Sequence, residues 1–91
     1  TLTPDKFSLE QNYPNPFNPV TRIQFNVPAN GYVNLTVFDI LGREVSVLVS
    51  ENLKAGTYAY TFDATGLVSG VYFYKITAGD FTSVKKMMLV K

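Results

Sequence analysis

The 91-residue chain contains no cysteine, no histidine and no tryptophan, and the first two absences exclude whole kinds of site. Without cysteine there are no disulfide bonds and no thiolate metal ligands. Without histidine the chain lacks the commonest general base, metal ligand and pH switch. The net charge of +1 is too balanced to indicate nucleic acid or an acidic membrane as a partner. No apolar run approaches the roughly 20 residues of a membrane-spanning helix, so membrane insertion is not expected.

The polar residues that are present form no catalytic pattern. Nucleophilic catalysis needs a nucleophile beside a base and an oxyanion site, but the seven acidic residues are scattered along the chain. Asp39, Asp63 and Asp80 occupy turn positions, where an aspartate accepts hydrogen bonds from backbone N–H groups. A calcium site built from loop oxygens is the alternative for these residues. The glycines are isolated, so no phosphate-binding loop is expected. We predict no enzyme, no cofactor and no metal site.

What the chain does contain is alternation of apolar and polar residues, in segments 21–27, 32–38, 44–50, 57–62 and 71–76. Such period-two segments, rich in valine, tyrosine, phenylalanine and threonine, are typical of half-buried strands. A sixth segment, 81–91, breaks the alternation at Lys85 and Lys86, which favours a strand with a bulge or one solvated face. With a short strand in 7–11, the pattern predicts an all-β fold: a single antiparallel immunoglobulin-like β-sandwich of about seven strands.

The alternation also predicts which side chains form the core and where the chain turns. The expected buried residues are Ile23, Phe25, Val33, Leu35, Val37, Val47, Tyr60, Phe62, Tyr72 and Ile76. Asn30-Gly31 is a strong signal for a tight hairpin. Residues 39–42 and 78–80 each combine an aspartate with a glycine, which predicts two further turns.

Two smaller patterns have both a structural and a functional interpretation. Residues 53–60 and 67–74 share the sequence L-x-x-G-x-Y-x-Y, which we interpret as two glycine-led starts of core strands. Tyr32, Phe38 and Phe73 fall on the strand faces opposite the predicted core. Exposed aromatic rings can stack on sugars, although apolar side chains are also common on ordinary protein surfaces.

The segment "NYPNPFNP", residues 12–19, is unusual in a chain of strands because it contains three prolines. Proline fixes φ and disfavours helix at the residue before it, so the segment is stiff and loses little entropy when it docks. We expect Tyr13 and Phe17 to anchor it on the sandwich, and Asn15 and Asn18 to bond the local backbone as Asx turns. At the other end, half of the eight basic residues lie from Lys75 onward. These lysines either blunt an edge strand or form a handle for an acidic partner.

Taken together, "FSLEQNYPNPFNPVTRIQFNVP", "VNLTVFDILGREVSVLV", "LKAGTY", "GLVSGVYFYKI" and "KKMMLVK" resemble the C-terminal sorting domains of the type IX (Por) secretion system, with every block in order. The resemblance runs from Phe7 to Lys91. It implies that residues 1–6 end a linker to a parent protein and that residues 7–91 are the sorting domain. It also implies an immunoglobulin-like sandwich, a job in protein secretion, and occurrence in Bacteroidetes and related phyla.

The resemblance further implies specific partners. A fused N-terminal cargo would pass through the periplasm, the outer-membrane translocon would recognise the domain, and a sortase-like protease would then remove it. The parent would end as a secreted or cell-surface protein, and the domain itself is expected to be a monomer. The candidate recognition residues are Asn15, Pro16, Phe17, Asn18, Gly70, Tyr72, Lys85, Lys86 and Lys91. The alternative is a non-catalytic carbohydrate-binding or fibronectin-like accessory module of a secreted enzyme.

Overall fold

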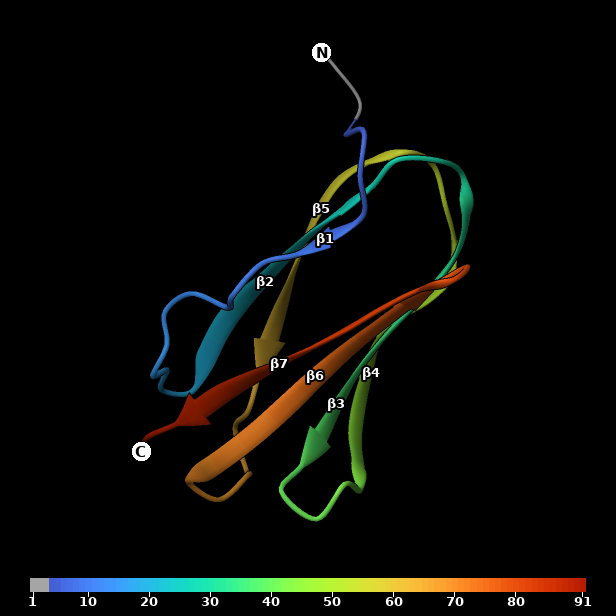
Figure 1. Ribbon diagram of the computed structural model, residues 1–91. Coiled ribbons are helices and arrows are strands. Elements are labelled where there is room, and N and C mark those ends of the chain that lie inside the picture. Colours follow the sequence, from blue (N-terminus) through green and yellow to red (C-terminus); the bar gives the residue numbers. More distant parts are fainter. Residues whose placement is uncertain (1–3) are drawn as a thin grey trace.

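A computed structural model describes residues 4–91, which fold into seven strands and no helix. The strands are β1 (Ser8–Leu9), β2 (Val20–Val27), β3 (Gly31–Asp39), β4 (Glu44–Leu53), β5 (Gly56–Asp63), β6 (Gly70–Ala78) and β7 (Phe81–Leu89). They lie in two antiparallel sheets of order β1-β2-β5 and β4-β3-β6-β7, which face each other as two layers (Figure 1). This arrangement confirms the predicted all-β sandwich. Its β4 pairs with β3, whereas the fourth strand of an antibody constant domain pairs with the fifth.

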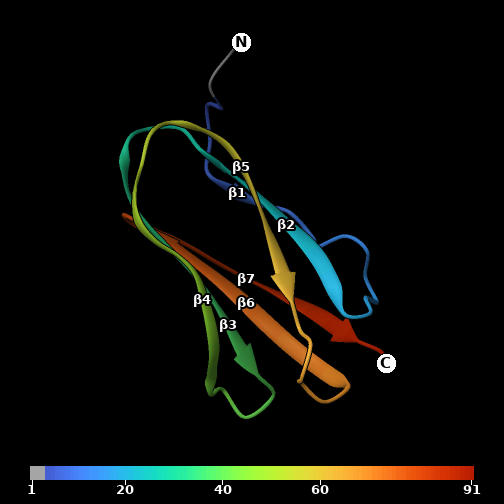
Figure 2. The ribbon, with the colours of Figure 1, turned by 180° about the vertical axis from the view of Figure 1, so that it is seen from behind.

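Four of the strands form one long hairpin that is folded over on itself. The pairing of β2 with β5 runs from Val20 opposite Asp63 to Val27 opposite Gly56. It continues beyond the bend as the pairing of β3 with β4. Segments 28–30 and 54–55 run side by side around this bend (Figures 1 and 2), where the Asn30 side chain accepts a 2.8 Å bond from the Ala55 N–H. Asn30-Gly31 therefore marks the crossing between sheets, and the predicted tight hairpin at that point is wrong.

The core lies between the inner faces of the two sheets and agrees with most of the predicted list. Eight of the ten expected residues are buried, while Tyr60 is half-buried on the edge strand β5 and Val47 is 44% exposed. The error at Val47 has a local cause. Leu35 pairs with Val49 but Thr36 pairs with Val47, so Leu48 is an extra residue in β4. A bulge of this kind reverses which residues face inward, so the run of valines in β4 does not share one face.

The two predicted turns are present. The Asp39 N–H donates to the Arg43 carbonyl across the β3–β4 turn, where Gly42 adopts a φ of 81°. Gly79 adopts a φ of 59° in the two-residue connection between β6 and β7. The last strand pairs with β6 from Phe81 to Leu89 without interruption, so the bulge considered for segment 81–91 does not occur.

The repeated L-x-x-G-x-Y pattern corresponds to one local structure used twice. Gly56 and Gly70 begin β5 and β6 with φ values of 159° and 152°, a region that residues with side chains rarely adopt. In each copy the tyrosine two residues later donates its hydroxyl hydrogen to a carbonyl four residues upstream. Tyr58 donates to Lys54 at 2.6 Å, and Tyr72 donates to Val68 at 2.7 Å. The predicted glycine-led strand starts are confirmed, and each is closed by a tyrosine bond of the tyrosine-corner type.

Candidate recognition surface

The proline-rich segment 12–19 connects β1 to β2 and reaches across to the free edge of β7. The peptide bonds before Pro14, Pro16 and Pro19 are cis. The Phe17 N–H donates to the Met88 carbonyl at 3.0 Å, and the Val90 N–H donates to the Phe17 carbonyl at 2.9 Å. The Phe17 ring is buried and packs edge-on against Phe62 at 6.2 Å between ring centroids. Phe17 is thus the predicted anchor, and it joins the segment to both sheets.

Two further side chains bond backbone groups along the free edge of β7. The Met88 N–H donates to the Asn15 side-chain oxygen at 3.0 Å, and the Gln11 side-chain nitrogen donates to the Lys86 carbonyl at 2.7 Å. From the Lys86 carbonyl to the Val90 N–H, the outward-pointing backbone groups along this edge are therefore met by residues 11–17. The expectation of local Asx turns is wrong for Asn15, which bonds a residue far along the chain. No side-chain bond of Asn18 is found within residues 4–91.

A buried polar network holds the base of the proline-rich segment. The Asn12 side chain donates to the Pro14 carbonyl and to the Thr21 hydroxyl, and Thr21 in turn donates to the Pro14 carbonyl at 2.9 Å. Asn12 and Thr21 are both buried. Tyr13, the other predicted anchor, forms an isolated bridge with Arg22, and its side chain is 80% exposed. Asn12, the polar residue beside Tyr13, therefore holds the segment. The sequence analysis did not predict this role.

Tyr74 ties the same region to the centre of the four-stranded sheet. Its hydroxyl donates to the Glu10 carbonyl and accepts from the Asn12 N–H, both at 2.7 Å. The side chain is completely buried. Burial raises the pKa of the Tyr74 hydroxyl to about 12, against the smaller opposite effect of the Asn12 N–H. The hydroxyl is therefore neutral at physiological pH and acts as a fixed crosslink.

The candidate residues of β6 adjoin the end of β7. Gly70 pairs with Leu89 and Tyr72 pairs with Met87. The Lys91 N–H donates to the Ser69 hydroxyl at 3.0 Å, which holds the chain beyond β7 against the loop before β6. Because Phe17 and Tyr72 are buried, a partner cannot contact their rings. They lie beneath the surface, whereas Asn15, Pro16, Asn18 and Lys91 are exposed.

The adjacent lysines of β7 point to opposite faces. Lys86 is exposed on the outer face, while Lys85 is half-buried on the inner face of the strand, opposite the buried Tyr74. A handle for an acidic partner needs an exposed ammonium group, and Lys86 meets this condition more fully than Lys85. The one ion pair within residues 4–91 joins Arg43 to Asp39 at 2.8 Å, so no carboxylate pairs with either lysine there. An inward-pointing charge on an edge strand discourages further strand pairing.

An apolar groove that the sequence analysis missed lies beside this surface. It has a volume of about 410 Å³ and runs between the β3–β4 turn and the loop before β6. Ile40, Leu41 and Val68 line it with 68–77% of their surface exposed. The signal in the sequence was the presence of large aliphatic residues in turns, where polar residues are the norm.

All three turn aspartates were predicted to accept hydrogen bonds from backbone N–H groups, and two of them, Asp39 and Asp63, do so. Asp39 accepts from the Leu41 and Arg43 N–H groups, and the Arg43 backbone bond is the main cause that lowers its pKa. The Thr65 hydroxyl and N–H likewise lower the pKa of Asp63. Asp80 makes no such bond within residues 4–91. No group of three potential metal-ligating side chains is found in that range.

The aromatic residues outside the core do not form one platform. Phe38 and Phe73 pair across β3 and β6 and are half-buried. Tyr32 lies six residues before Phe38 on β3, about 20 Å away at the rise of an extended strand, and its hydroxyl bonds to Ser50. This geometry gives no support to the sugar-stacking alternative.

The comparison with protein families identifies the class. Residues 11–91 match the family model described as the secretion system C-terminal sorting domain, and the chain belongs to that family. No curated protein matches the chain. The domain is thus a C-terminal secretion signal for type IX secretion. Membership implies a fused cargo and a parent protein that passes the periplasm to become secreted or surface-bound. Within residues 4–91, no helix is long and apolar enough to cross a membrane.

Proposed function

We propose that the type IX machinery recognises the end of the sandwich where segment 11–19, the start of β6 and the end of β7 meet. The observation that supports this most is the convergence itself, because three distant blocks of sequence are bonded together there. The exposed side chains on that end include Asn15, Pro16, Asn18, Lys86 and Lys91. A cation without a carboxylate partner is available to an acidic partner. The domain itself performs no catalysis in this proposal.

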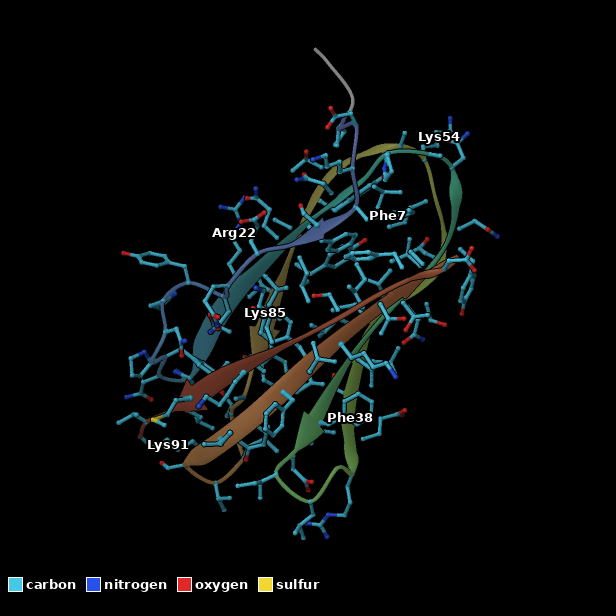
Figure 3. The ribbon with its side chains drawn as sticks, in the orientation of Figure 1. Phe7, Arg22, Phe38, Lys54, Lys85 and Lys91 are labelled. Carbon is cyan, nitrogen blue, oxygen red and sulfur yellow. The ribbon has the colours of Figure 1, made fainter. Side chains whose placement is uncertain are left out.

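The location of this end suits a signal carried by a larger protein. Phe7 stacks on Phe81 at the end of the sandwich from which the chain leaves toward the cargo, and Lys91 lies toward the opposite end (Figure 3). A cargo attached before Phe7 would therefore leave the proposed recognition end uncovered. We further propose that a sortase-like protease cleaves at or before the linker 1–6. Asp5 and Lys6 are exposed and precede the first strand, while residues 1–3 lie outside the described residues.

Charge reversal at Lys86 tests the proposal. Fused to a reporter in a bacterium with this secretion system, Lys86→Glu should leave the reporter in the periplasm, because an acidic partner would be repelled. The melting temperature should hardly change, since surface substitutions alter stability by less than about 0.5 kcal/mol. Lys54→Glu is the matched control, as Lys54 is also exposed but lies at the other end of the molecule (Figure 3).

The test changes Lys86 alone and leaves Lys85 unchanged, because Lys85 is half-buried. A carboxylate at Lys85 would face the buried Tyr74 and could lower stability by desolvation, which would be mistaken for lost recognition. If Lys86→Glu is folded and its reporter reaches the surface at wild-type levels, recognition through Lys86 is excluded. If Lys54→Glu also retains the reporter in the periplasm, overall charge is responsible and not the proposed end.

A further inference from the structure

The free edge of β5 differs from that of β7, because nothing in the described chain covers it. β5 pairs only with β2 and forms one border of the three-stranded sheet. Figure 2 shows β5 running along this border. The Ala64 N–H donates to the Pro19 carbonyl, so even-numbered residues of β5 direct their backbone groups toward β2. Thr57, Ala59 and Thr61 consequently direct their N–H and carbonyl groups outward.

This edge also lacks the features that keep strands apart. Its pairing with β2 shows no register shift, so it has no bulge. From Gly56 to Phe62 it contains no charged residue and no proline. Thr57, Ala59 and Thr61 are exposed. A regular, uncharged edge strand of this length is a template for pairing with another chain.

The sequence of the edge selects the partner. Residues 57–61 read "TYAYT", which is the same in both directions about Ala59. If a second copy lay antiparallel with Ala59 opposite Ala59, Thr57 would face Thr61 and Tyr58 would face Tyr60. Threonine pairs and aromatic pairs are among the combinations that stabilise neighbouring strands. The outward groups of residues 57, 59 and 61 would then be the ones that exchange hydrogen bonds.

We propose that two copies of the chain associate through β5, related by a two-fold axis at Ala59. The two three-stranded sheets then form one six-stranded sheet of order β1-β2-β5-β5-β2-β1. The rings of Tyr58 and Tyr60 are held in place for this contact, because both stack on Phe25 at 5.6 and 5.8 Å between centroids. This proposal goes beyond the secretion signal and replaces the expectation of a monomer.

Charge complementation at Ala59 tests both the association and its register. In sedimentation experiments over a wide concentration series, the unchanged chain should form a dimer. Ala59→Lys and Ala59→Glu should each weaken the dimer about tenfold or more, because like charges would lie directly opposite at the axis. An equimolar mixture of the two variants should restore association. This restoration also shows that neither variant is simply misfolded.

Other results overturn the proposal. A chain that remains monomeric at the highest concentration has no such interface. A dimer unaffected by either Ala59 variant uses another surface, and Val84→Glu on the free part of β7 is the matched variant that identifies an interface there. A mixture that stays monomeric although both variants are folded excludes the register centred on Ala59.

Discussion

Two of the edge strands of the sandwich, β7 and β5, are treated in opposite ways. The edge of β7 is closed from Lys86 to Val90 by residues 11–17, and the Lys85 side chain points inward beside it. The edge of β5 is uncovered within residues 4–91 and uncharged from Gly56 to Phe62. Since edge strands are protected where pairing would be harmful, the difference indicates that β7 must stay unpaired while β5 need not.

The same contrast explains why residues 11–17, which form the cover of the β7 edge, contain prolines. Any strand laid beside β7 would satisfy its groups but would present a new edge of its own. Pro14 and Pro16 have no N–H to offer, so the cover ends the sheet without extending it. Their fixed φ also reduces the entropy lost when the segment docks. The unusual composition of segment 12–19 therefore follows from its position.

The largest effect on stability is expected when Phe17, the residue that anchors this cover, is replaced. Phe17→Ala should lower the free energy of unfolding by about 3–5 kcal/mol, because a buried phenylalanine leaves a cavity. Tyr13→Ala, four residues earlier in the same segment, should change it by less than about 0.5 kcal/mol because Tyr13 is exposed. Denaturant unfolding of the two variants checks both values.

Equal losses for the two variants would mean that the cover is held by its whole length and not by Phe17. A negligible loss for Phe17→Ala would show that the segment is only loosely docked, and the contrast between the two edges would disappear.

Most of the fold could be predicted from the sequence because each strand has one buried face. The alternation in segments 21–27, 32–38 and 71–76 matches the observed inner faces. The pattern failed in β4, since a bulge at Leu48 depends on how β4 pairs with β3 and not on its own residues. It failed at Asn30 as well, because the same turn residues suit a hairpin and a bend between sheets.

The candidate surface was less predictable, since its parts are bonded through long-range contacts. The resemblance singled out Asn15 and Phe17, but nothing local to them indicates that Met88 is their partner. Nor could alternation assign Lys85 and Lys86 to inner and outer faces, because the run was interrupted there by two charges. The position of β7 beside segment 11–17 decides these contacts, and that position is a property of the whole sandwich.

A smaller effect is expected from the crosslink on the β7 side. Tyr74→Phe should cost about 1–3 kcal/mol at neutral pH, because the Glu10 carbonyl and the buried Asn12 N–H lose their shared partner. Tyr58→Phe is the control on the β5 side, where the hydroxyl bond to Lys54 is exposed and its loss should cost less.

The cost of Tyr74→Phe should also depend on pH. The folded-state pKa of Tyr74 is raised to about 12, above the value of roughly 10 in an unfolded chain. The unfolded state therefore loses this proton first, so the stabilisation is complete below about pH 10 and declines as pH rises toward 12. The difference in melting temperature between the unchanged chain and Tyr74→Phe should narrow over that interval. A difference that stays constant would show that the hydroxyl does not titrate in this way.

The smallest effect is local and separates the two edges directly. Asn15→Ala should cost only about 1 kcal/mol, because the Met88 N–H loses its acceptor but is exposed enough to bond water.

Amide hydrogen exchange should distinguish the two edges more clearly than stability does. In the unchanged chain at low concentration, the Met88 amide should be protected, while the outward amides of Val84 and Ala59 exchange rapidly. In Asn15→Ala the Met88 amide should become as fast as these two, and the Val90 amide should stay protected through Phe17. Asn15→Asp, which keeps the acceptor, should retain the protection of Met88. Slow exchange of Met88 in Asn15→Ala would mean that Phe17 alone closes β7, and slow exchange of Ala59 at low concentration would mean that the β5 edge is not open.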